Sequence, residues 1–319
     1  MKTQIKHAGL RALRSAGVFS IVSRVRRRDT LLILCYHGIS LEDEHLWEPG
    51  LYITPETFRR RLEALRALKA NVLPLGAALA GLKSGKLPPR SVVLTFDDGF
   101  FDFYKYALPA LQEFGFPATL YLTTYYCDRR LPIFNLMMSY MLWKRGPRET
   151  AQGEPRVREI ARIMEDAERN KWDAAAKDEQ ARKFAESLGL DYTGMTNSKL
   201  FQIMSPDEAS ECARRGVDIQ LHTHRHRTPD DRDLFLREIR DNARRIQELA
   251  GSAPTHFCYP SGVTAPQFLP WLKEAGVTSA TTCEHGLARS STDPLMLPRY
   301  SDGSSVTDID FESWLSGVR

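Results

Sequence analysis

The sequence of 319 residues has no run that approaches the roughly 20 apolar residues needed to span a bilayer. It also has little cysteine, five residues scattered without a Cys-x-x-Cys pair. That scarcity predicts neither a disulfide framework nor a zinc–thiolate site. The apolar stretch Ala16–Val22 is interrupted and is followed by arginines rather than by a cleavage site, so it does not predict a signal peptide. We therefore expect a cytoplasmic protein.

Acidic residues are absent from the first 28 positions, which hold eight lysines and arginines. Because the whole chain carries +4, the remainder carries −4. The basic character therefore belongs to one segment, which argues against a nucleic-acid-binding face on the body of the protein. Residues 1–28 have the pattern of a basic amphipathic helix. Such a helix either lies on an anionic membrane surface or docks on its own domain, and the sequence leaves both open.

From residue 31 onward, short apolar runs alternate with helical patterns. This alternation predicts a parallel sheet covered by crossover helices, an α/β fold whose seven or eight strands suggest a distorted barrel. We expect residues 1–30 to form a basic N-terminal segment and residues 31–319 to form the barrel, with a charge-rich helical insertion at about 128–199. The strands are expected at 31–36, 71–74, 92–96, 118–122, 217–221, 256–259, 277–282 and 297–300.

Two adjacent carboxylates, Asp97 and Asp98, follow the apolar run that begins at Val92 and precede Gly99. Their position is the carboxyl end of a buried strand, where α/β folds place their chemistry. Two neighbouring acids repel each other unless a positive charge lies between or beside them. A metal ion on one carboxylate would leave the other free as a base. The alternative is an ordinary turn, for which Asp-Asp-Gly is also suitable.

A pair of histidines, His222 and His226, follows the expected strand 217–221. On the first turn of a helix, residues four apart share a face, so both rings could bind one metal ion, and His224 should point elsewhere. Solvated loop histidines are the simpler reading of this pair alone. Together with Asp98, the pair becomes a site of two histidines and one carboxylate. Such a site leaves coordination positions open, as catalytic zinc requires.

The segment Thr95–Gly99, taken with His222-Thr223-x-x-His226, resembles the polysaccharide deacetylase family of NodB-homology carbohydrate esterases. The resemblance implies a distorted (β/α)7 barrel that removes N-acetyl groups from amino sugars, usually with Zn²⁺ and in principle with Co²⁺ or Ni²⁺. By position, Asp97 would be the general base, and Asp98, His222 and His226 would be the metal ligands.

The segment Phe257–Gly262 resembles the family's third motif, which implies that the Ser261 amide donates to the oxyanion. That motif usually contains an arginine that orients the base, but Cys258 stands in its place. Arg299 is our candidate substitute, and a salt bridge that closes the barrel end is the alternative.

The C-terminal Leu-x-His motif that provides the family's general acid is absent. Tyr36-His37 instead resembles the motif order of the exopolysaccharide deacetylase branch. We therefore expect His37 to protonate the leaving amine, with His285 as its rival.

These observations favour a metal-dependent deacetylase that acts on an N-acetylated glycan or glycolipid and not on nucleic acid. The basic segment 1–28 suggests a lipid-linked saccharide held at a membrane surface, with the protein peripheral to the inner membrane. Removal of an O-acetyl or formyl group would use the same reaction centre. The alternative from a different class of protein is a glycan-binding domain without catalytic activity.

Overall fold

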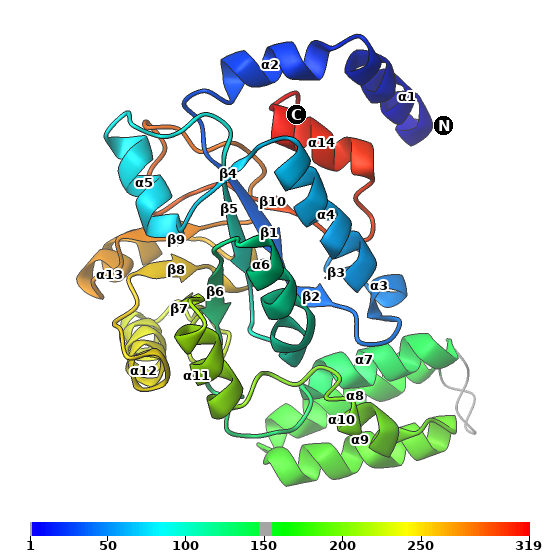
Figure 1. Cartoon of the computed structure of the whole chain (residues 1–319). Helices are drawn as coiled ribbons and strands as arrows, with labels where there is room; N and C mark the ends of the chain where they lie inside the picture. The colour runs from blue at the N-terminus through cyan, green and yellow to red at the C-terminus, as the bar shows by residue number, and fades with distance from the viewer. Residues whose placement is uncertain (1, 147–154) are drawn as a thin grey trace.

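The computed structural model describes residues 2–146 and 155–319, and a curled parallel sheet forms its centre (Figure 1). The strand order is β10-β1-β5-β6-β7-β8-β9, with β4 (Asn71–Val72) paired to β5 beside this path. The segment before β10 forms a parallel bridge with β9, from Leu297 to Thr281. The predicted α/β class with a curled, barrel-like sheet is confirmed. The strand bounds are β1 Leu32–Tyr36, β5 Ser91–Phe96, β6 Thr119–Leu122, β7 Asp218–Leu221, β8 His256–Cys258, β9 Ser279–Thr281 and β10 Tyr300–Ser301.

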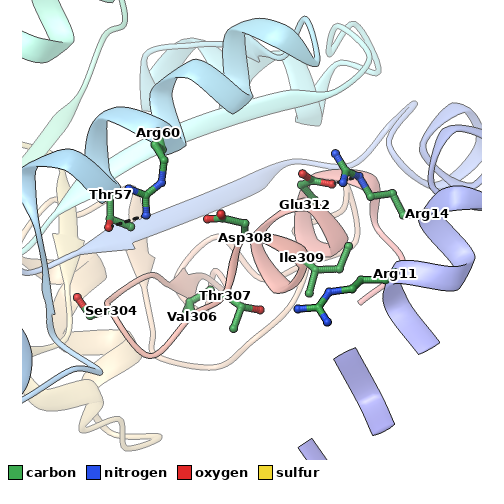
Figure 2. A pocket seen from close by; sticks show the side chains of 10 residues that line it. All are labelled: Arg11, Arg14, Thr57, Arg60, Ser304, Val306, Thr307, Asp308, Ile309 and Glu312. Carbon is green, nitrogen blue, oxygen red and sulfur yellow. Dashed lines mark hydrogen bonds and ion pairs between the residues drawn. The ribbon is translucent and has the colours of Figure 1, made fainter. Parts of the chain in front are cut away.

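The N-terminal segment forms two helices, α1 (Lys2–Ser15) and α2 (Val18–Arg26), and not the single helix that we expected. The chain changes direction at Gly17, whose φ of 75° is left-handed and accessible to glycine without strain. Both helices pack on α14 (Asp308–Ser316), a helix that we did not predict (Figures 1 and 2). Docking on the chain's own body is thus the arrangement observed. Whether residues 1–30 are a separate unit stays a prediction.

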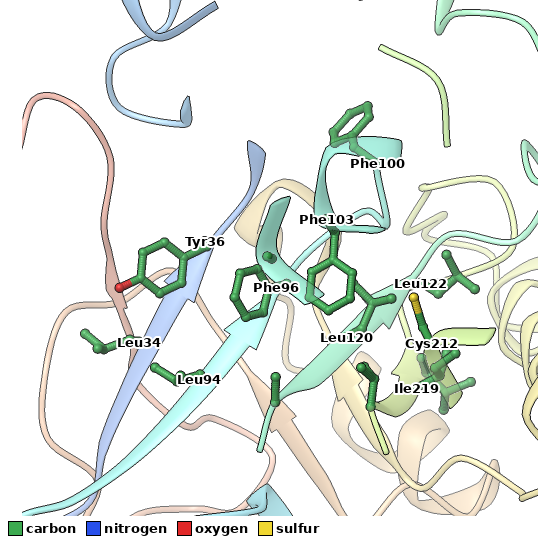
Figure 3. Packing of buried hydrophobic residues seen from close by; sticks show 14 of the residues in the cluster. Leu34, Tyr36, Leu94, Phe96, Phe100, Phe103, Leu120, Leu122, Cys212 and Ile219 are labelled. Atoms are coloured by element: carbon green, nitrogen blue, oxygen red, sulfur yellow. The ribbon is translucent and has the colours of Figure 1, made fainter. Parts of the chain in front are cut away.

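The central strands β1 and β5 consist mostly of apolar residues, as is typical of parallel strands that are buried on both faces. Strands β1 and β5 are buried at every residue and pair in parallel, with Leu34 opposite Leu94. Aromatic side chains extend this packing toward the carboxyl ends of the strands, where the rings of Tyr36 and Phe96 stack 5.2 Å apart (Figure 3). The residues that follow β1 and β5 are therefore held at one edge of a rigid sheet.

The covering helices begin where their capping residues predict. Thr54 accepts a hydrogen bond from the amide of Thr57 at the start of α4, and Ser205 forms a capping box with Glu208 at the start of α11. The helix expected at 106–114 differs, because a π-helical turn at Phe103–Ala107 precedes α6. The helix bounds are α4 Pro55–Ala67, α5 Leu75–Lys83, α6 Leu108–Phe114, α11 Pro206–Arg214, α12 Arg232–Ala250 and α13 Phe268–Glu274.

The region expected to be a helical insertion consists of α7 (Phe134–Arg145), α8 (Arg156–Arg169), α9 (Ala174–Leu188) and α10 (Tyr192–Asn197). These helices lie to one side of the sheet (Figure 1) and share a hydrophobic cluster of their own. The methionines of α7 belong to that cluster and are fully buried, so their side chains serve packing. Before this region, the short elements β2 (Gly38–Ile39), α3 (Glu44–Trp47) and β3 (Tyr52–Ile53) were not predicted.

Candidate active site

The two adjacent carboxylates are separated by the turn that follows β5. Asp97, directly after β5, is still tied to β1, because its amide donates to the carbonyl oxygen of Tyr36 at 2.9 Å. Asp98 and Gly99 then adopt left-handed backbone angles, with φ of 70° and 88°. A Cβ on Gly99 would lie 2.3 Å from Cδ1 of Leu122, so a larger residue here would have to displace that buried side chain as well as adopt the left-handed backbone. This turn gives the two acids different sets of partners.

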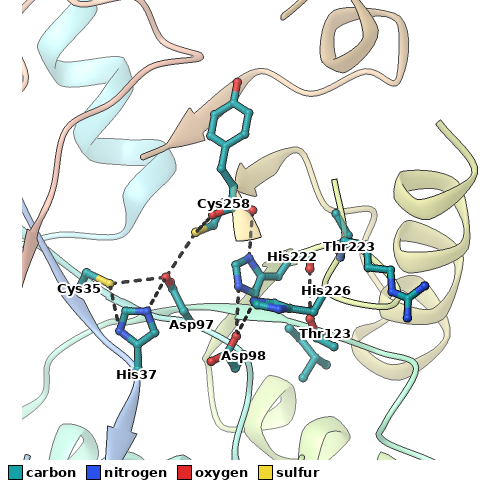
Figure 4. Close-up of polar contacts among 12 residues, drawn as sticks. Cys35, His37, Asp97, Asp98, Thr123, His222, Thr223, His226 and Cys258 are labelled. Atoms are coloured by element: carbon teal, nitrogen blue, oxygen red, sulfur yellow. Dashed lines mark hydrogen bonds and ion pairs between the residues drawn. The ribbon is translucent and has the colours of Figure 1, made fainter. Parts of the chain in front are cut away.

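Asp98 faces two histidines (Figure 4). Its Oδ1 lies 3.2 Å from Nε2 of His222 and 3.2 Å from Nε2 of His226. Burial raises the pKa of Asp98, but the hydrogen bonds and charges of the two imidazoles lower it well below its usual range. Nδ1 of His222 donates to the carbonyl oxygen of Cys258 at 2.9 Å, and this bond fixes the orientation of the ring with Nε2 on the side of Asp98. One carboxylate and two imidazoles, one of them oriented by a backbone carbonyl, match the donor set of a catalytic zinc site.

The histidine pair does not lie on a helix, so that expectation was wrong. Residues 222–227 form an irregular loop in which Thr223 and His226 have φ of 58° and 57°. The loop is closed by hydrogen bonds from the Arg227 amide to Thr223 Oγ1 at 3.0 Å and from the Arg225 amide to a Glu238 carboxylate oxygen at 2.7 Å. Loop curvature, and not helical periodicity, brings the two imidazole rings together.

His224 lies outside the triad, as its spacing predicted. Its Nδ1 contacts Thr124 Oγ1 at 2.9 Å. Its ring also packs edge-on against that of Tyr125, with centroids 5.5 Å apart.

Asp97 forms a buried ion pair with Arg299. The guanidinium makes two bonds to it, Nη1 to Oδ1 at 2.7 Å and Nη2 to Oδ2 at 2.8 Å, and the two side chains are 1% and 2% exposed. Burial alone raises the pKa of Asp97, but the charge and hydrogen bonds of Arg299 outweigh burial and hold that pKa well below its usual range. The structure thus brings the candidate substitute arginine to the predicted base, although the two residues are far apart in sequence.

Two thiols complete the surroundings of Asp97. Cys258, which stands in the place of the family's arginine, has its Sγ 3.4 Å from Asp97 and 3.1 Å from Arg299 Nη2. Cys35 Sγ lies 3.5 Å from the same carboxylate. Burial raises the pKa of both thiols well above the usual value, so they are neutral groups beside the ion pair.

The two rival histidines occupy different places. His37 follows β1, lines the cleft, and its Nε2 lies 3.6 Å from Asp97 Oδ2. His285 instead packs against the rings of Tyr300 and Trp314, at centroid distances of 5.3 and 6.4 Å, and is not among the cleft residues. Ser261 also lines the cleft, on a short turn with φ of 55°. Its assignment as oxyanion donor stays a prediction.

These side chains open onto a cleft of about 700 Å³. Its far wall includes residues that the sequence did not single out, Trp47 and Tyr52 from the region of α3 and β3, and Asn135 and Ser139 from α7. A second cavity of about 980 Å³ runs along the helical insertion and is lined by the aromatic residues Tyr125 and Trp172. The two cavities share the lining residues Tyr126, Ile133, Asn135, Arg225 and Arg227.

Comparison with known sequences gives two matches. A sequence model of the polysaccharide deacetylase family matches residues 84–280, which include both motifs. The poly-β-1,6-N-acetyl-D-glucosamine N-deacetylase of Staphylococcus epidermidis is 35% identical over 101 residues. That match covers 32% of this chain and 34% of the relative, so it spans about a third of either protein.

Solved structures with a similar fold include the Streptococcus pyogenes deacetylase PplD in complex with acetate, with a TM-score of 0.62 and 18% identity, covering 90% of this chain and 98% of that one. IcaB from Ammonifex degensii gives a TM-score of 0.60 and 18% identity, covering 91% and 98%. At these identities the similarity concerns the fold alone, and each of the two structures shares that fold with this chain over nearly its whole length.

Proposed function

The chain belongs to the polysaccharide deacetylase family, and we propose that it is a metal-dependent hydrolase that removes the acetyl group from an N-acetylated sugar of a glycan. The observation that carries this proposal is that the two adjacent acids have different partners. Asp97 is held ionised by Arg299 beside a separate group of one carboxylate and two imidazoles. A buried base next to a convergent donor set is what metal-assisted amide hydrolysis requires.

Asp98, His222 and His226 would hold the cation, which we propose to be Zn²⁺, with Co²⁺ or Ni²⁺ as substitutes. Their ligand atoms lie within 4.8 Å of one another, and the hydrogen bond from His222 to the Cys258 carbonyl oxygen fixes that ring. When bound, the cation would supply the positive charge that polarises the acetyl carbonyl and acidifies a water molecule. Orienting bonds of this kind are typical of metal-bound histidines.

The remaining polar groups of the cleft have separate roles in this proposal. Asp97, oriented by Arg299, accepts the proton of the attacking water. The Ser261 amide donates a hydrogen bond to the oxygen that becomes negative when the carbonyl is attacked. His37, next to Asp97 at the cleft, donates a proton to the amine as the carbon–nitrogen bond breaks. The products are acetate and a glycan with a free amino group.

The size of the cleft supports a glycan substrate. A cavity of about 700 Å³ exceeds what one acetylated sugar needs, and its continuation along the insertion presents aromatic rings. Flat aromatic surfaces next to polar groups suit the faces and hydroxyls of sugar rings. Poly-β-1,6-N-acetyl-D-glucosamine, the polymer in the name of the Staphylococcus epidermidis relative, is therefore the first substrate to test, as a free oligosaccharide and in lipid-linked form.

The experiment measures metal and acetate together. Purified protein is incubated with β-1,6-linked N-acetylglucosamine oligosaccharides, and acetate and free amines are quantified by mass spectrometry. We expect about one zinc per chain. Asp98→Ala should lose both zinc and activity, whereas Asp97→Asn should lose activity and keep zinc. Asp218→Asn, at the opposite end of the sheet, is the matched control and should resemble the wild type.

Other outcomes separate the alternatives. Release of acetate only from O-acetylated sugars would replace the N-deacetylase assignment with an O-deacetylase. Release of formate from N-formyl sugars would replace it with a deformylase. A folded, metal-free protein that binds the oligosaccharide without cleavage would instead indicate a glycan-binding domain.

A further inference from the structure

The N-terminal helices use one face of each helix to bind the body. Leu10 of α1 and Phe19 of α2 are buried against Ile309 of α14. Asp310 of α14 accepts bonds from Lys6 Nζ at 2.9 Å and His7 Nε2 at 2.8 Å. These contacts determine which sides of α1 and α2 remain in solvent.

A buried arginine anchors the end of α2. The Arg27 side chain is fully buried and donates to the carbonyl oxygens of Leu315, Thr30 and Ser91. The second helix is therefore not free to rotate its outer side inward.

The outer sides of the helices are apolar. Val25, Ile5 and Ile21 are 70%, 66% and 64% exposed, which makes them the three most exposed large hydrophobic side chains that the structure describes. Ile21 and Val25 are four residues apart on α2 and so share one face. Leu13 of α1 is 41% exposed as well. Exposed branched aliphatic residues concentrated on two short helices indicate a surface that another molecule covers when the protein functions.

The same N-terminal segment carries cations that have no acidic partner among the described residues. Within residues 2–146 and 155–319, Arg11, Arg24 and Arg28 form no ion pair, whereas Arg14 binds Glu312. Arg11 points into a cavity of about 540 Å³ between α1, α4 and α14, which Arg60 also lines (Figure 2).

A second cavity lies on the inner side of α2. It has a volume of about 880 Å³ and is lined by Arg24 and Arg28 together with the apolar residues Phe19, Leu68 and Leu315. Arg11, Arg24 and Arg28 are nevertheless exposed to solvent, and Arg24 adjoins Val25, so positive charge and exposed apolar side chains lie close together along this segment.

We propose that this N-terminal surface, formed by Ile5, Leu13, Ile21 and Val25 with Arg11, Arg24 and Arg28, binds the anionic phospholipid surface of a membrane. Aliphatic side chains would enter the boundary between headgroups and acyl chains, and the arginines would bind lipid phosphates. Since the segment 1–28 has no acid, the same segment of a second copy would meet this surface with like charge. A nucleic acid would satisfy the arginines but would leave the aliphatic side chains exposed.

Vesicle flotation of the full chain tests the proposal. The protein is mixed with vesicles of phosphatidylcholine, with and without phosphatidylglycerol. We expect binding to the anionic vesicles and little to the neutral ones. The variant Ile21→Ser/Val25→Ser should lower the partition coefficient roughly tenfold or more, and Arg24→Gln/Arg28→Gln should lower it by a similar factor. The matched controls are Val157→Ser/Leu234→Ser and Arg158→Gln/Arg237→Gln, which alter exposed residues elsewhere and should bind as the wild type does.

Three results would overturn the proposal. The first is wild-type protein that does not float with anionic vesicles. The second is flotation that Ile21→Ser/Val25→Ser leaves unchanged. An example would be vesicle binding that depends on the arginines alone, so that added double-stranded DNA displaces the protein from the vesicles. The third is a concentration-dependent dimer that this same variant abolishes, which would assign the surface to a second copy. Deacetylation of soluble oligosaccharide should be equal in all these variants, so failure of membrane binding and failure of the proposed activity are separable.

Discussion

Removal of the Arg299 guanidinium should be the most informative single change. In Arg299→Met, Asp97 would stay buried while losing both charge-assisted bonds, of 2.7 and 2.8 Å. Breaking a buried ion pair by removing one partner costs about 3–5 kcal/mol, because the remaining charge is left without compensation. That is a large part of a typical unfolding free energy of about 5–15 kcal/mol. We therefore expect a folded but markedly weakened protein, measured by urea denaturation at low temperature.

The same change should slow the reaction. An unrestrained Asp97 would leave the position needed for proton abstraction, and a displacement of about 1 Å can cost about a hundredfold in rate. Arg299→Lys keeps the charge without the second bond and should fall between wild type and Arg299→Met. In Cys258→Arg/Arg299→Met, a guanidinium from the position of the family's motif would re-enter the space next to Asp97. The Cys258 Sγ lies only 3.4 Å from that carboxylate, so we expect partial recovery of activity.

A second buried pair separates stability from catalysis. Arg61 Nε lies 2.9 Å from Asp302 Oδ2, with side chains 2% and 0% exposed, and neither residue lines the cleft. Arg61→Met should therefore cost a similar free energy of unfolding and leave the kcat of the folded protein unchanged. Wild-type kcat in Arg299→Met, or an equal fall of kcat in both variants, would refute a role of Arg299 in orienting the base.

Further changes test the acid, the turn and the N-terminal helices. His37→Ala should lower kcat about 10²–10⁴-fold with zinc retained, whereas His285→Ala should not; equal activities would remove His37 as the acid. Gly99→Ala should reduce zinc content and activity, because its Cβ would meet Leu122 at 2.3 Å from a left-handed backbone; normal zinc binding would contradict this reading of the turn. Burial raises the pKa of Asp310, but its hydroxyl, ammonium and imidazole partners lower it well below the ordinary 3.8. The ionised Asp310 therefore stabilises the docking of α1 on α14 at neutral pH. This stabilisation is lost as the pH falls below about 3.8 toward the pKa of Asp310 in the folded protein. Protection of the amides of residues 2–26 against hydrogen exchange, measured relative to the intrinsic rate at each pH, should fall in acid, and Asp310→Asn should lower that protection at pH 7.

Local chemistry explains which features the sequence could predict. Apolar runs must be buried, and capping residues such as Thr54 and Ser205 satisfy free amides of the next helix, so strands and helix starts were found close to their observed positions. The family resemblance rested on the segments around Asp97 and His222, each of which sits directly after a strand. Because parallel strands end at the same edge of a sheet, local pattern was enough to predict that these groups would meet.

Other features follow from contacts between distant parts of the chain. Periodicity says that a residue is buried but not which neighbour it meets, so Arg299 could be proposed as the partner of Asp97 but not placed there. The sequence ranked His37 above His285, and only the folded chain shows that one lines the cleft while the other packs against Tyr300. The segment from His222 to His226 was predicted to be helical. Its loop shape depends on a bond to Glu238 of α12, a contact that local sequence does not reveal.

The sequence by itself determined the kind of chemistry, because carboxylates and histidines at strand ends are a local property of the chain. The tertiary structure decided how these groups are used. The curl of the sheet brings Arg299 to Asp97 and leaves Asp98 to the two histidines. Packing on α14 turns the apolar sides of α1 and α2 outward, because their other sides are already occupied by Leu10, Phe19 and their neighbours. Both results depend on which distant surfaces meet, and no local pattern contains that information.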